Sequence, residues 1–82
     1  MIWTPPKDWQ DSLRHELSAA AHDAGMTMWA AGAAMGRRDT PPRWFRRSTV
    51  TGKIAMPNLR IFVDFCGVVG VSPSEILRRA GL

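Results

Sequence analysis

The sequence predicts an all-α domain of five short helices, and two observations support this prediction. Apolar residues recur at intervals of three and four, as at Leu13, Leu17 and Ala20, which is the spacing of one face of an α-helix. Apolar and polar residues alternate with a period of two only around residues 49–54, so no ordinary strand is expected. The 82 residues are enough for one domain with a small core.

The first helix is expected over residues 8–24, after an extended arm at residues 1–7. Two prolines exclude a helix from the arm, and Asp8 is suited to cap the helix that follows. Gly25 is suited to end it, because glycine readily adopts the left-handed conformation found after helices. Residues 8–82 are then expected to form one helical domain.

A second helix is expected from Thr27, as its N-cap, to about Met35. Ala31 and Met35 lie one turn apart and are expected to face the core. Gly36 follows at the position where a glycine commonly ends a helix.

The next stretch, residues 37–53, holds most of the positive charge. It contains six basic residues and one acid, a net charge of +5, whereas the whole chain carries +4, so the remainder sums to −1. Positive charge gathered on a nearly neutral scaffold favours a polyanionic partner. Nine of the eleven basic residues are arginine, which donates two hydrogen bonds to a phosphate or a guanine.

A third helix is expected within this stretch, from about residue 41 to residue 51. Asp39 or Thr40 is suited to cap it, and prolines are tolerated in a first turn. At about 100° per residue, Trp44, Phe45 and Ser48 share one side, which we expect to be buried. The opposite side, expected to be presented to a partner, carries Arg43, Arg46, Arg47 and Val50.

The last two helices have stronger capping sequences. Asn58 is expected to cap a helix over residues 59–69, with core residues Leu59, Phe62, Val63, Cys66 and Val69. The sequence Ser72-Pro73-Ser74-Glu75 matches a capping box, and it is expected to start a fifth helix with Ile76, Leu77 and Ala80 inward.

Composition and motifs exclude several classes of function. The chain has no apolar run long enough to span a membrane and no secretory signal at its start. Its single cysteine, Cys66, cannot form an internal disulfide, so we expect a reducing cytosolic (cytoplasmic) compartment. We expect Cys66 to be buried and inert, and His15 and His22 to be surface residues too far apart to share a metal ion. No catalytic constellation is present, so we expect no enzyme, no cofactor, no metal and no small-molecule ligand.

Two parts of the chain resemble the lambda-repressor-like helix-turn-helix family. The first is Gly25-Met26-Thr27 with Ala31, Gly32, Met35 and Gly36, in which a small mid-helix residue, here Gly32, allows two helices to cross closely. The second runs from Gly52-Lys53 through Pro57 and Asn58-Leu59 to Gly70-Val71-Ser72-Pro73-Ser74-Glu75-Ile76-Leu77. The resemblance implies a compact five-helix fold that binds double-stranded DNA with its third helix in the major groove, usually as a homodimer.

On this interpretation the basic residues divide into two groups. Residues expected to contact base edges are those on the exposed face of the third helix: Arg43, Arg46, Arg47 and Val50. Residues expected to contact backbone phosphates flank that helix: Thr27, Arg37, Arg38, Thr40, Lys53 and Arg60. Arg78 and Arg79 are expected to be solvated charges at the end of the last helix.

The resemblance implies a transcriptional regulator similar to the small Cro-type repressors of temperate phages. The last expected helix reaches the end of the chain, so we expect no ligand-sensing domain. A dimer surface is expected to use apolar residues outside the core, with candidates at Ile61, Val68, Ile76 and Leu82. The alternatives are a recombination directionality factor, or a protein-interaction module such as an antitoxin or a phage inhibitor of a host protein. In the last case Trp3, Trp9, Trp29 and Trp44 would be the aromatic anchors.

Overall fold

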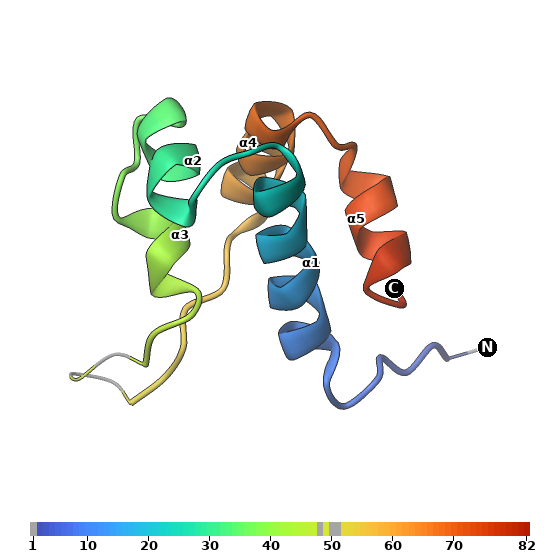
Figure 1. Cartoon of the computed structure of the whole chain (residues 1–82). Helices are drawn as coiled ribbons and strands as arrows, with labels where there is room; N and C mark the ends of the chain where they lie inside the picture. The colour runs from blue at the N-terminus through green and yellow to red at the C-terminus, as the bar shows by residue number, and fades with distance from the viewer. Residues whose placement is uncertain (1, 48, 50–51) are drawn as a thin grey trace.

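The protein is built from short helices. A computed structural model describes residues 2–47, 49 and 52–82. Within those residues it has five α-helices and no β-strand (Figure 1): α1 (Trp9–Asp23), α2 (Met28–Ala34), α3 (Thr40–Arg43), α4 (Leu59–Val69) and α5 (Pro73–Arg79). The all-α prediction is therefore confirmed, with an isolated antiparallel bridge between Arg47 and Ile54 as the one addition in the described residues.

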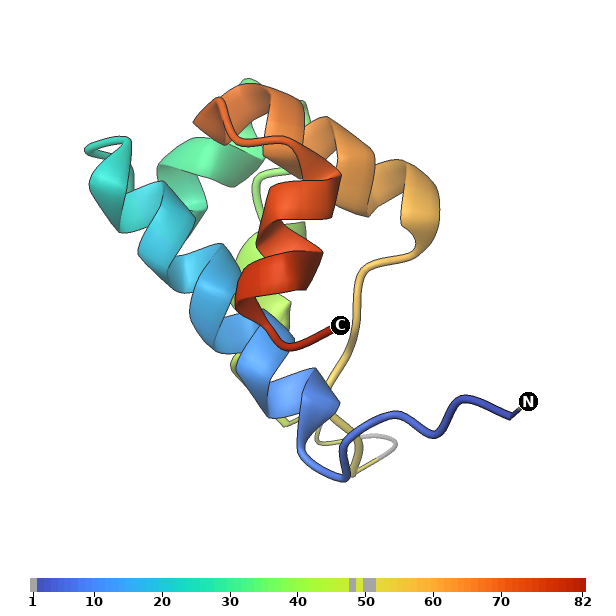
Figure 2. The same cartoon turned by 90° about the vertical axis from the view of Figure 1, so that its right-hand side faces the viewer.

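The helices form a bundle around α1. Figure 1 shows α2 and α3 on one side of α1 and α5 on the other, and α1 contacts both α2 and α5. Helix α4 packs against α2 and α5 and closes the upper end of the bundle (Figure 2). Residues 44–47 lead away below α3, and residues 52–58 lead back to the start of α4 (Figure 1). None of the described helices has the length and apolar character needed to cross a membrane.

The core combines aliphatic residues of α1 and α5 with aromatic residues from the rest of the chain. Trp44, which follows α3, is 1% exposed, and its ring meets that of Phe65 edge-on with centroids 5.2 Å apart. Such aromatic pairs add about 0.5–1.5 kcal/mol beyond the burial of their surface. Leu17 and Ile76 are completely buried beside them. Ile76 is therefore not available for a dimer surface, and Ile61, Val68 and Leu82 are partly buried against the core.

Side-chain caps fix the starts of three helices as the sequence predicted. The side-chain oxygens of Thr27, Asn58 and Ser72 accept hydrogen bonds from the backbone N–H three residues later, at 2.9–3.2 Å. Asp8 stands at the N-cap position of α1 but makes no side-chain cap hydrogen bond. The capping box at α5 is formed in its forward half, while the carboxylate of Glu75 instead accepts hydrogen bonds from Arg78 and Arg79.

Helix α4 has the predicted bounds but a different inward face. Phe62, Cys66 and Val69 are buried as expected, whereas Leu59 and Val63 are exposed. Phe65, which was not predicted to be in the core, is completely buried. The helix is rotated so that Phe65 faces Trp44, and this rotation turns Leu59 and Val63 outward because they lie on the opposite edge of the apolar stripe.

The prediction of a third helix from residue 41 to residue 51 is wrong, because α3 ends at Arg43. Beyond it, the amides of Trp44, Phe45 and Arg46 donate to carbonyls three residues back, which is the tighter 3₁₀ pattern. The bridge between Arg47 and Ile54 then turns the chain back on itself. Pairing of Arg47 with a residue seven positions later excludes a continuous helix there, and β-branched residues such as Thr49 and Ile54 favour extended backbone.

Candidate nucleic-acid interface

Gly32 brings α2 against the backbone that leads into α3. A Cβ atom at position 32 would lie 2.6 Å from the carbonyl oxygen of Arg38 and 2.8 Å from that of Arg37. The amide of Arg37 donates to the carbonyl of Gly32 at 2.8 Å, which locks the turn onto α2. Only glycine allows this approach. It fixes the backbone of Arg37 and Arg38, whose side chains are exposed at the surface.

Trp44 anchors the segment that carries the next two arginines. Its side chain is buried against Phe65, while Arg43 on one side of it and Arg46 on the other are exposed. Phe45 was predicted to be buried with Trp44, but 46% of it is exposed. Trp44 and Phe45 are consecutive residues and leave the backbone at least about 100° apart, so the burial of Trp44 does not carry Phe45 into the core. One aromatic ring, not two, therefore fixes this segment to the core.

The four residues predicted to contact base edges do not share one helix face. Arg43 is the last residue of α3, Arg46 lies in the 3₁₀ turn, and Arg47 lies in the bridge with Ile54. The Nη1 atom of Arg47 donates a hydrogen bond to the carbonyl oxygen of Gly52. Val50 lies outside the described residues. The arginines are thus gathered in one segment of the chain but are not aligned along a rigid rod.

Among the residues predicted to contact phosphates, Thr27 has a defined structural role. Its hydroxyl oxygen accepts a hydrogen bond from the amide of Ala30 at 3.0 Å, and the residue remains exposed at the start of α2. Thr40 is half-buried at the start of α3, and Asp39 before it makes no side-chain cap hydrogen bond. Lys53 and Arg60 are exposed, on the segment before α4 and in its first turn.

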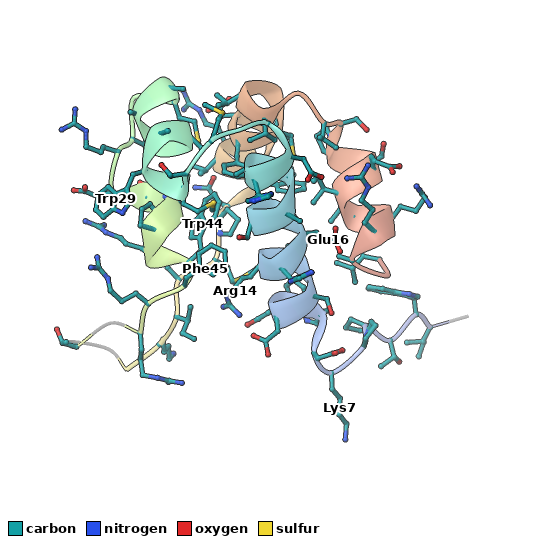
Figure 3. All side chains as sticks on the ribbon, in the orientation of Figure 1. Lys7, Arg14, Glu16, Trp29, Trp44 and Phe45 are labelled. Atoms are coloured by element: carbon teal, nitrogen blue, oxygen red, sulfur yellow. The ribbon has the colours of Figure 1, made fainter. Side chains whose placement is uncertain are left out.

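The exposed arginines of residues 37–47 lie on one side of α1. The turn between α2 and α3, helix α3 and the segment after it all lie on the same side of α1 (Figure 1). Figure 3 shows Trp29 and Phe45 on this side as well. Arg37, Arg38, Arg43 and Arg46 therefore give this side a strong positive potential, and Trp29 and Phe45 on the same side are half exposed.

The two arginines of α5, on the opposite side of α1, are paired with a carboxylate. Glu75 accepts two hydrogen bonds from Arg78 and one from Arg79, and these three bonds, with the attraction of the guanidinium groups, hold the pKa of the Glu75 carboxyl below its usual value. Arg78 and Arg79 were predicted to be solvated tail charges, and their pairing reduces the positive charge at this end. Among the described residues, the unpaired positive charge is therefore greater on the side of α1 that carries α2 and α3.

Arg14 is a buried charge that the sequence analysis missed. Its side chain on α1 is 9% exposed, and its Nη1 atom donates to Asp11 at 2.9 Å. Its position could have indicated this, because residue 14 lies about 20° around the helix from Ala21, an alanine beside Ala20 of the apolar stripe that is itself buried. Its Nε atom is buried and has no hydrogen-bond partner in the described part of the chain.

Other reactive groups do not form a site. Burial raises the pKa of the Cys66 thiol to about 11, which keeps it protonated and unreactive as expected. Across residues 2–47, 49 and 52–82, no group of three or more histidine, cysteine and acidic residues is arranged to hold a metal ion.

Comparison with known proteins gave no match: neither a protein-family model, nor a curated protein, nor a solved structure matches this chain.

Proposed function

We propose that the chain is a small double-stranded DNA-binding protein that regulates transcription. Its contact surface would be formed by α2, α3 and the arginine-bearing segment that follows. The observation that carries this proposal is the concentration of exposed arginine on one side of an otherwise nearly neutral bundle. Arginines on a rigid support attract a polyphosphate and release its counterions.

The close contact of α2 with the turn before α3 supports a helix-turn-helix arrangement. In such a unit the second helix approaches the major groove while the first crosses the backbone. Helix α3 is a single turn, so in this proposal α3 supplies Arg43 and the following 3₁₀ turn supplies Arg46. These two side chains are the candidates for base edges, because neither guanidinium is placed in a described hydrogen bond or ion pair.

The remaining basic residues of this side are assigned to phosphates. Arg37 and Arg38 lie in the turn after α2, and Arg47 and Lys53 lie on the segment between α3 and α4. The hydroxyl of Thr27, at the start of α2, is assigned to a phosphate with them. Contacts of this kind set the position of a protein on DNA but do not read its sequence. In this proposal the protein acts as a Cro-like repressor that binds a two-fold operator as a homodimer.

A salt titration tests DNA binding directly. If six charges neutralise phosphates, log K should fall against log salt with a slope of about −5. Fluorescence anisotropy with a labelled random duplex measures this slope. A flat dependence on salt would contradict the proposal.

Sequence preference is tested by replacing Arg43 and Arg46 together by alanine. We expect the variant to lose preference for DNA selected from a random pool, because each arginine–guanine contact contributes about 1–3 kcal/mol of discrimination. The matched control replaces Arg78 and Arg79, which removes the same formal charge from the far end of the bundle. Equal effects of the two double variants would show that charge alone is sensed, without base readout.

The exposed aromatic residues favour a second candidate, a protein-interaction module. Trp29 and Phe45 are 49% and 46% exposed, and large half-exposed rings are common at protein interfaces. Trp44 is buried and is excluded as an anchor. Replacement of Trp29 by alanine should weaken binding to a protein partner but should leave the salt slope on DNA unchanged.

A further inference from the structure

A hollow of about 500 Å³ lies between the first turns of α1 and the segment that precedes α4. Three cationic side chains line it: Arg14 from α1, and Arg47 and Lys53 from the opposite wall. The only carboxylate among its lining residues is that of Asp11, so the ionisable groups of the lining carry a net charge of +2. The hollow therefore has the charge of a site for a small anion.

Arg14 supplies an observation that is independent of this charge. Its side chain is more than nine-tenths buried, its Nε atom has no hydrogen-bond partner in the described chain, and its Nη1 atom donates to Asp11. Asp11 is itself 82% exposed, so water weakens the attraction between its carboxylate and the guanidinium of Arg14. An anion beside the guanidinium of Arg14 would therefore add to the weak charge compensation that Asp11 provides.

The other groups at the hollow are arranged to receive an acceptor. The guanidinium of Arg47 is tied to the carbonyl oxygen of Gly52, which holds it at the rim. Helix α1 begins at the hollow, and its N-cap residue Asp8 makes no side-chain cap hydrogen bond. The positive end of the α1 dipole therefore adds to the field of the side chains.

We propose that this hollow binds the oxyanion of a single phosphate group between Arg14 and Arg47. A phosphate carries up to two negative charges, which matches the net charge of the lining. Its tetrahedral oxygens accept hydrogen bonds from two guanidinium groups that approach from different directions. The same chemistry is offered by free phosphate, by a mononucleotide and by the backbone of a nucleic acid. For free phosphate or a mononucleotide the site is independent of the proposed DNA-binding function, whereas a backbone phosphate at this site rests on that function, which already assigns Arg47 and Lys53 to phosphates.

Nuclear magnetic resonance of the ¹⁵N-labelled full chain tests the site. Sodium phosphate is titrated against sodium chloride at equal ionic strength, and the Nε–Hε signal of Arg14 and the amide signals of Gly52 and Lys53 are followed. We expect these signals to shift saturably with phosphate and not with chloride. Parallel titrations with a nucleoside 5′-monophosphate and with a short duplex identify the source. Saturation by phosphate or the monophosphate indicates a free ligand, and saturation by the duplex alone indicates a backbone phosphate. Linear, chloride-like shifts with all three would overturn the site.

Two variants make the assignment specific. Arg47→Gln should weaken phosphate binding by about tenfold, the effect of losing one charge-assisted contact, and Arg14→Gln should weaken it at least as much. If Arg14→Gln fails to fold, Arg47→Gln decides alone. The matched control is Lys7→Gln, which removes one positive charge from a side chain that points away from the bundle (Figure 3). Unchanged phosphate affinity in Arg47→Gln, or an equal loss in Lys7→Gln, would overturn the proposal.

Discussion

At the scale of single residues, two glycines in the middle of helices have opposite roles. Gly32 of α2 lies against the backbone of Arg37 and Arg38, whereas a Cβ atom at Gly67 of α4 would meet nothing within 4 Å. The first glycine is therefore required by packing. The second only lowers the helix propensity of its segment.

We expect Gly32→Ala to destabilise the protein by about 1–3 kcal/mol, the usual cost of forcing an extra group into a packed site. The opposing atoms belong to the backbone and cannot move aside as a flexible side chain can. The control is Gly67→Ala, which should leave the free energy of unfolding unchanged or raise it by up to about 1 kcal/mol. Urea denaturation measures both. Equal effects would mean that α2 and the turn are not in close contact.

Glu75 gives the stability a dependence on pH. Because Arg78 and Arg79 lower the pKa of its carboxyl from the usual value of 4.5 in the folded state, its contribution is complete above that value. The contribution is lost as the pH falls through the lower pKa of the folded state. The melting temperature of the natural chain should therefore exceed that of Glu75→Gln near neutral pH by a small margin, since the groups are exposed. The difference should disappear in acid, and a margin that grows in acid would contradict the assignment.

At the scale of elements, the helix starts could be predicted from sequence and the end of α3 could not. Thr27, Asn58 and Ser72 cap their helices through bonds that span three residues, so a short window of sequence contains everything that determines them. The end of α3 depends on the pairing of Arg47 with Ile54 and on the contact of Trp44 with Phe65. Each of these partners lies beyond one helical turn, and Phe65 is in a different helix from α3, so local helix propensity gives no sign of them.

The caps of α4 and α1 offer a paired test. Asn58→Ala should lower the free energy of unfolding by about 1 kcal/mol, the usual loss for a cap whose side chain accepts a backbone hydrogen bond. Asp8→Ala should have a smaller effect, because Asp8 makes no such bond and retains only its favourable charge near the helix start. Thermal unfolding followed by circular dichroism compares the two variants, and a larger loss for Asp8→Ala would reverse the assignment.

At the scale of the whole molecule, one tryptophan joins the basic segment to the bundle. Trp44 comes from the part of the chain with the most positive charge, yet it is buried in the core beside Phe65. The candidate site was therefore predictable as a charged segment, while its shape was not. The contact of Trp44 with the core fixes the position of the segment. The bridge between Arg47 and Ile54 then sets the direction of the backbone at Arg47.

Trp44→Ala should lower the free energy of unfolding by about 3–5 kcal/mol, as expected for removal of a large buried ring. Trp29→Ala is the matched control, since Trp29 is half exposed and its loss should change stability by no more than about 0.5 kcal/mol. Denaturation with urea distinguishes these outcomes. Similar losses for both variants would show that Trp44 does not hold the segment.

The single thiol of the chain gives a way to observe when the core opens. Cys66, on α4, is buried in the core, and its burial keeps the thiol protonated. An alkylating reagent therefore cannot modify it while the helices remain packed. The rate at which the reagent reacts with the natural chain therefore reports the frequency of opening events, without any introduced dye. Addition of DNA or phosphate should slow that reaction if either one binds only the closed bundle.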